Sequence, residues 1–173
     1  MKSIRFALPL IILGASTFAG EVKVTLSGLH ICCSTCVAAI NTATKSLSGA
    51  KVVVDKDGGR VLIVATDTAA AQSAADAIAG AGFQGKSDNK EIVIKEDSGA
   101  AEGKVAKLEL NAHNCCGKCA HDMDVAIKAV PGVKGTTIKP KIASFTVTGN
   151  FDAKAVIKAL EDAGFHPASG AKK

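Results

Sequence analysis

The spacing of apolar residues along the chain alternates between that of a strand and that of a helix, which predicts alternating strands and helices. Residues 22–29 and 105–112 read as strands, and each is followed by a segment in which apolar residues recur at helical spacing. Gly49 and Gly132 follow these helices as stop signals. The expected buried faces consist of Val37, Ile40, Ala43 or Thr44, and Leu47 in the first helix, and of Cys119, Met123, Ile127 and Val130 in the second.

Two extended segments and a second helix follow in each half of the chain. Residues 51–55 and 60–64 flank a Lys-Asp-Gly-Gly turn and predict a hairpin, and the second half offers residues 135–139 and 142–147 as its counterpart. The second helices are expected at residues 69–81 and 152–163, and both end in Ala-Gly-Phe. Final strands are expected at residues 91–95 and, more weakly, at residues 165–168.

The same order of elements therefore occurs twice, with corresponding positions 82 or 83 residues apart. The order is β-α-β-β-α-β, which predicts an α+β protein of two tandem ferredoxin-like domains, each an antiparallel sheet with two helices on one face. We expect the first domain at residues 20–97, a polar, glycine-containing linker at residues 98–103, the second domain at residues 104–169, and a C-terminal tail at residues 170–173.

Residues 1–19 have the features of a secretory signal peptide. Lys2 and Arg5 precede a short apolar run, and small residues follow it up to Ala19. The run is too short to span a bilayer, and no cysteine follows it to carry a lipid anchor. We therefore expect a secreted or periplasmic protein without a stable membrane anchor.

All six cysteines lie in two copies of one pattern, His-x-Cys-Cys-x-x-Cys. Several sulfurs gathered at one point favour a soft metal ion, because thiolates select Cu(I), Zn(II) and their heavier relatives. We expect one soft transition-metal ion, Cu(I) or Zn(II), in each domain. The candidate ligands are His30, Cys32, Cys33 and Cys36 in the first copy and His113, Cys115, Cys116 and Cys119 in the second.

The position of each cluster before a helix explains how it would bind a cation. A Cys-x-x-Cys at a helix start places both thiols near free backbone N–H groups, which favour the thiolate. Two thiolates suffice for Cu(I), whereas a third thiolate and an imidazole would complete a Cys3His zinc site. Other roles stay open: a local redox pair for the Cys-x-x-Cys thiols, a buried apolar residue or a transfer thiol for Cys32 and Cys115, and a polar strand end for His30 and His113.

These motifs resemble those of the heavy-metal-associated domain family, which includes copper chaperones and the N-terminal domains of metal-pumping ATPases. The resemblance extends over both halves, with Cys33 to Cys36 and Cys116 to Cys119 at the family's Cys-x-x-Cys positions and a Gly-Phe after each second helix. It implies that Phe83 and Phe165 pack near the metal loop. The extra cysteines, the histidines and the missing methionine depart from the family pattern.

Composition and charge narrow the function further. Without Lys2 and Arg5, the chain carries 19 Lys and Arg residues against 16 Asp and Glu, and residues 20–173 contain no Trp or Tyr. Neither a concentrated basic face nor stacking aromatics are visible, so we expect no nucleic-acid partner. No catalytic constellation stands out, so we expect a metal-binding protein, not an enzyme, with a metal-transporting or metal-accepting protein as partner. The alternatives are a thiol–disulfide redox protein and a partner-binding module.

Overall fold

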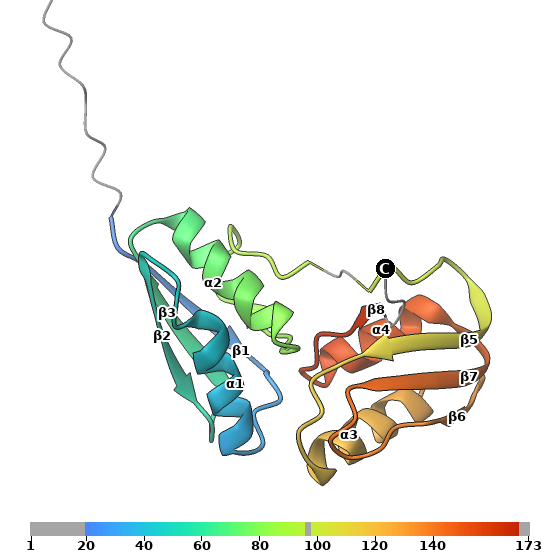
Figure 1. Cartoon of the computed structure of the whole chain (residues 1–173). Helices are drawn as coiled ribbons and strands as arrows, with labels where there is room; N and C mark the ends of the chain where they lie inside the picture. Colours follow the sequence, from blue (N-terminus) through green and yellow to red (C-terminus); the bar gives the residue numbers. More distant parts are fainter. Residues whose placement is uncertain (1–19, 96–97, 170–173) are drawn as a thin grey trace, which may run out of the picture.

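The computed structural model describes residues 20–95 and 98–169, so the predicted signal peptide and the C-terminal tail lie outside the described residues. The described residues form two units, side by side in Figure 1, each with a four-stranded antiparallel sheet and two helices on one face of it. This is the α+β, ferredoxin-like architecture that the order of elements predicted. No helix in the described part of the chain is long and apolar enough to cross a membrane.

The first unit has its strands in the order β2-β3-β1-β4. Alternate residues of β1 and β3 are buried beneath the two helices, and the alanine-rich face of α2 allows that helix to pack closely on the sheet. The predicted hairpin is confirmed, because β2 and β3 pair in register on either side of the glycine turn. The elements are β1 (Val22–Ser27), α1 (Ser34–Thr44), β2 (Ala50–Asp55), β3 (Arg60–Ala65), α2 (Thr68–Gly80) and β4 (Lys86–Ser87).

The second unit repeats the arrangement with the order β6-β7-β5-β8. Its core is filled by larger side chains than that of the first unit, among them Phe145, Phe151, Met123 and Leu160. The elements are β5 (Lys104–Asn111), α3 (Gly117–Lys128), β6 (Val133–Thr136), β7 (Ser144–Asp152), α4 (Ala153–Asp162) and β8 (Ala168–Ser169).

The prediction of a final strand at residues 91–95 is wrong. The edge strand of the first unit is the shorter β4, which pairs with the end of β1. The later segment lies against α2 instead, because the Gln72 side chain both donates to the Val93 carbonyl (2.9 Å) and accepts from its N–H (3.0 Å). Ile92 is buried while Val93 is 49 % exposed, so the apolar alternation here serves packing on a helix and not on a sheet.

Two further boundaries differ from the prediction. Residues 139–142 form a turn, and β7 continues well beyond residue 147 because its last residues pair with Val133 and Lys104. In the first helix the fully or nearly fully buried positions are Cys36, Ile40 and Thr44, and the helix ends before Leu47. The Thr44 hydroxyl is accommodated in the core because it donates to the Ile40 carbonyl (2.9 Å).

Candidate metal site between the two units

The cysteine motifs lie at the starts of the two helices that follow β1 and β5. Cys33 and Cys116 are the N-cap residues of α1 and α3, with extended backbone (φ −154° and −156°). Cys36 and Cys119 follow in the first turn and are completely buried. Each motif therefore presents its sulfurs at the amino end of a helix, as the sequence predicted.

The two motifs face each other, and their six sulfurs form one cluster. Within each unit the Cys-x-x-Cys sulfurs are 3.8 Å (Cys33 to Cys36) and 3.7 Å (Cys116 to Cys119) apart. Contacts between the units are equally short. Cys32 Sγ lies 3.5 Å from the sulfurs of both Cys116 and Cys119, while Cys115 Sγ lies 3.5 Å from that of Cys33 and 3.6 Å from that of Cys36.

All six thiols are free. Among the described residues, two groups of four sulfurs are compact enough to hold a metal ion, with all members within 4.8 Å of one another. One group consists of Cys32, Cys33, Cys36 and Cys115, and the other of Cys32, Cys115, Cys116 and Cys119. The sequence predicted a separate site in each domain, whereas in the structure each group takes a sulfur from the other unit.

The thiols differ in acidity because their surroundings differ. The backbone N–H of Cys36, at the start of α1, stabilises the thiolate of Cys33 and lowers its pKa to about 6, and that of Cys119 lowers the pKa of Cys116. Burial acts in the opposite direction on Cys32, Cys115 and Cys119 and raises the pKa of each thiol. The N-cap thiols are therefore the ones that ionise most readily.

His30 and His113 lie at the junction, but neither belongs to the four-ligand groups. The His30 ring stacks on Phe165 (centroids 4.3 Å apart), and the His113 ring lies against Phe83 (4.6 Å). Burial lowers the pKa of both imidazoles, and the Nε2 atom of each has no hydrogen-bond partner among the described residues. The structure thus gives each histidine a packing role against the other unit, and a ligand role stays a prediction.

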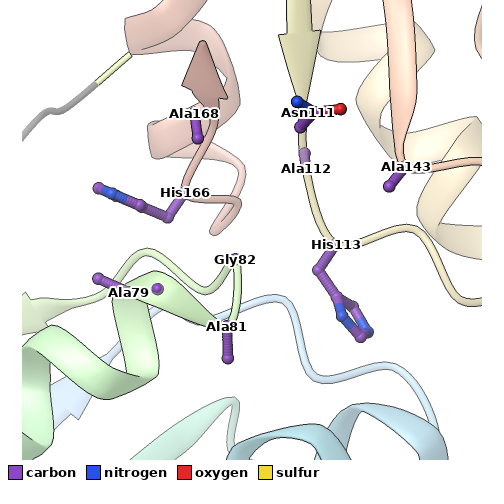
Figure 2. A pocket seen from close by; sticks show the side chains of 10 residues that line it. Ala79, Ala81, Gly82, Asn111, Ala112, His113, Ala143, His166 and Ala168 are labelled. Carbon is purple, nitrogen blue, oxygen red and sulfur yellow. The ribbon is translucent and has the colours of Figure 1, made fainter. Parts of the chain in front are cut away.

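The Gly-Phe turns after α2 and α4 hold the two units together. Phe83 and Phe165 form an antiparallel bridge, in which Gln84 N–H donates to the Gly164 carbonyl (3.1 Å) and His166 N–H to that of Gly82 (3.0 Å). Figure 2 shows Gly82 between His113 and His166, beside a cleft of about 350 Å³ lined mainly by small side chains. The resemblance implied that the phenylalanines pack near a metal loop, and each packs on the histidine of the other unit's loop.

Glycine is required at both turns. Gly82 and Gly164 have φ of +92° and +85°, and each follows the end of a helix as a glycine in the left-handed conformation. A Cβ on Gly82 would lie 2.7 Å from His113 Cβ and 2.8 Å from its backbone nitrogen, and a Cβ on Gly164 would overlap His30 N. The close approaches of Gly82 and Gly164 and the two Phe–His ring contacts therefore occur in reciprocal pairs, with the two units exchanged.

Sequence reasoning missed two polar residues that support the junction. The Gln84 side chain is 2.7 Å from His166 Nδ1, across the two turns. Asp122 on α3 lies 3.6 Å from His30 Nδ1 and also pairs with Lys118 (2.8 Å). The offset of 82 residues between Gln84 and His166 was visible in the sequence, but it carried no meaning until the two Gly-Phe turns were seen to pair. His121, on the same helix as Asp122, is exposed.

Comparisons with known proteins find a family match within the second unit. No curated protein matches the chain. Among solved structures, the N-terminal soluble domains of Bacillus subtilis CopA share 16% identity, with 86% of this chain and 93% of that chain covered and a TM-score of 0.33. The first two RRM domains of the yeast poly(U) binding protein Pub1 share 12%, with 87% and 100% covered and a TM-score of 0.23.

Both TM-scores are below 0.5. The model of the heavy-metal-associated domain, however, matches residues 111–166, which include the second cysteine motif, α3 and the second Gly-Phe turn. Residues 111–166 are therefore similar to a heavy-metal-associated domain.

Proposed function

We propose that this chain is an exported protein that binds soft metal ions through the cysteines of both motifs and sequesters them. The observation that carries the proposal is the convergence of six free thiols, with neighbouring sulfurs 3.5–3.8 Å apart. The similarity of residues 111–166 to a heavy-metal-associated domain supports metal as the cargo. Export rests on the sequence features of residues 1–19.

The spacing of the sulfurs fits the donor set of a four-coordinate ion. Four sulfurs at the usual Zn–S distance of about 2.3 Å in a tetrahedron are about 3.8 Å from one another. The closest sulfur contacts in the two groups span 3.5–3.8 Å, so little movement is needed to reach that arrangement. This favours Zn(II), while Cu(I) remains the alternative because two or three of the same thiolates would hold it.

The chain's own residues prepare the site for a cation. The starts of α1 and α3 stabilise the thiolates of Cys33 and Cys116, which makes them the first groups to engage an ion. Cys32 and Cys115 have raised pKa values, so each must release a proton when it becomes a ligand. The Asp122 carboxylate raises the pKa of the Lys118 ammonium, and the nearby Cys32 and Cys116 add to this effect. Lys118 would therefore offset part of the negative charge of the thiolates.

Sequestration fits the geometry better than rapid transfer to a partner. Cys36 and Cys119 are completely buried, and the loop of each unit is covered by the loop of the other. A partner protein that exchanges ligands with the site would need the two units to separate first. Transfer of the ion to a metal-accepting protein would therefore be limited by the separation of the two units.

Thiol–disulfide exchange is the second candidate function, and one observation favours it. Cys33 has a pKa of about 6, so it is a thiolate at neutral pH, and thiol partners lie 3.5 Å and 3.8 Å from its sulfur. Such a thiolate is a good nucleophile. A redox protein of this kind would work on a model disulfide without any metal.

One titration separates these functions. Residues 20–173, fully reduced, are titrated with Zn(II) and with Cu(I) against a competing chelator, beside a variant with all six cysteines changed to serine. A Ser34→Ala variant serves as the control, since it alters the motif without touching a thiol. We expect the wild type and Ser34→Ala to bind metal and the variant with six serines to bind none. If neither ion binds and the protein turns over a model disulfide, the metal-binding proposal is wrong and the redox function is supported.

A further inference from the structure

In each His-x-Cys-Cys pattern the second cysteine pairs with the Cys-x-x-Cys partner of its own unit. The first cysteine instead lies between the two units. Cys33 and Cys36 lie together in the first unit, and Cys116 and Cys119 lie together in the second. Cys32 and Cys115 occupy the space between these pairs. Cys32 is 3.8 Å from Cys36 of its own unit but 3.5 Å from both Cys116 and Cys119.

Cys115 has the reciprocal arrangement. Its sulfur is 3.7 Å from that of Cys119 in its own unit, and 3.5 Å and 3.6 Å from those of Cys33 and Cys36 in the other. Both four-sulfur groups contain Cys32 and Cys115, and they differ only in which Cys-x-x-Cys pair completes them. A sulfur that belongs to both groups is placed to serve two ions at once.

We propose that the chain holds two ions in a single cluster, in which the thiolates of Cys32 and Cys115 bridge both ions. Cys33 and Cys36 complete the coordination of one ion, and Cys116 and Cys119 complete that of the other. This inference rests on the proposed metal-binding function and adds the nuclearity of the site and the sharing of its ligands between the units.

The number of ligands supports bridging. Two four-coordinate ions require eight metal–sulfur bonds, and the six sulfurs provide eight only if two of them bond twice. The two shared sulfurs are Cys32 and Cys115, one from each unit. Two separate three-thiolate sites would instead leave Cys32 closer to Cys36 than to the other unit, whereas its sulfur is 3.8 Å from that of Cys36 and 3.5 Å from those of Cys116 and Cys119.

Bridging also links metal binding to the docking of the two units. An ion held by Cys33 and Cys36 takes a ligand from the second unit, and the other ion takes one from the first. The Phe83 and Phe165 bridge already aligns the two loops before any ion arrives. Binding of the first ion therefore prepares both shared thiols for the second, so we expect the two ions to bind cooperatively.

The test uses reduced residues 20–173 loaded with ¹¹³Cd(II), a spectroscopic probe for tetrathiolate sites. We expect native mass spectrometry to find two cadmium ions per chain. We expect two cadmium resonances, with the β-protons of Cys32 and Cys115 correlated to both and those of the other four cysteines correlated to one each. Two resonances without any shared cysteine would overturn the bridged cluster and leave the metal-binding function intact. Binding of a single ion would also overturn it, and binding of none would overturn the function as well.

Serine variants provide a second measurement. Cys32→Ser removes a shared ligand and is expected to weaken the binding of both ions by at least about tenfold, since even residues that only support a ligand cost 10–100-fold. Cys33→Ser is the matched variant one residue away, and it should weaken one ion far more than the other. Cys115→Ser and Cys116→Ser repeat the comparison in the second unit. Loss of a single ion in Cys32→Ser and in Cys115→Ser would contradict bridging.

Discussion

A single added methyl group at Gly82 tests how the two units dock, because Gly82 lies against His113 of the other unit. An added methyl group in Gly82→Ala has two effects, because the residue has a φ of +92° and because its Cβ would lie 2.7 Å from His113 Cβ and 2.8 Å from His113 N. The first effect strains the turn inside the first unit. The second effect pushes the loop of the second unit away.

The two effects have different magnitudes and act on different equilibria. Left-handed backbone costs a residue with a Cβ about 1–2 kcal/mol, which lowers the free energy of unfolding. Relief of the overlap requires His113 to move by about 0.6–0.7 Å to reach ordinary contact. That movement weakens the Phe83–His113 ring contact and the hydrogen bond from His166 N–H to the Gly82 carbonyl. Together these losses are about 1–3 kcal/mol.

Opening of the junction should therefore become about 5- to 140-fold more populated, at 1.4 kcal/mol for each factor of ten. Amide hydrogen exchange of reduced, metal-free protein measures this directly. The N–H groups of Gln84 and His166 donate across the junction, so both should exchange faster in Gly82→Ala. Amides inside β3 should change only as far as the unit itself is destabilised.

Two matched controls separate strain from contact. Gly103 also has a positive φ (+86°), and Gly80 lies at the end of α2, and a Cβ at either position meets nothing within 4 Å. Gly103→Ala should reproduce the strain without opening the junction, and Gly80→Ala should do neither. If Gln84 and His166 exchange at the same rate in all three variants, the Gly-Phe turns do not hold the units together.

Three further outcomes follow from the same structure. The pKa of Cys33 is lowered from 9.0 to about 6, so the stability that its thiolate lends the metal-free chain is lost progressively as the pH falls from about 9 to about 6. Alkylation followed by mass spectrometry should show half-maximal reactivity of Cys33 near pH 6, while Cys32 stays protected at pH 8. His113→Ala should weaken the junction by about 1 kcal/mol yet leave the number of bound Cd(II) ions unchanged, whereas loss of an ion would make His113 a ligand. Removal of Zn(II) by a chelator should lower the thermal unfolding midpoint, because free ion at 100 times its dissociation constant contributes about 2.7 kcal/mol; an unchanged midpoint would contradict binding to the folded chain.

The elements of the fold were largely predictable because their signals are local. The hairpin of β2 and β3 follows from alternating residues around a glycine turn, and α2 and α4 follow from alanine-rich or amphipathic spacing that ends at Gly-Phe. Residues 91–95 misled the prediction for a tertiary reason. Their alternation suits a strand, but the Gln72 side chain satisfies the Val93 peptide groups and draws the segment onto α2.

The position of each cysteine motif was predictable from the sequence, but the meeting of the two motifs was not. The motifs place Cys33 and Cys116 at helix starts, which local sequence determines. Their meeting depends on contacts between residues 31 and 135 positions apart, such as His113 on Gly82 and His30 on Phe165. The repeated histidine and the repeated extra cysteine were the available signals, because both recur in the two copies without a place in the family pattern.

X-ray absorption of Zn(II)-loaded, reduced residues 20–173 tests most directly whether the two motifs form one all-cysteine cluster. The account predicts a first shell of four sulfurs at about 2.3 Å around each zinc, without nitrogen, and a second zinc as an additional scatterer beyond that shell. A shell of three sulfurs and one nitrogen, with no zinc neighbour, would instead mean two separate Cys3His sites and would contradict the shared cluster.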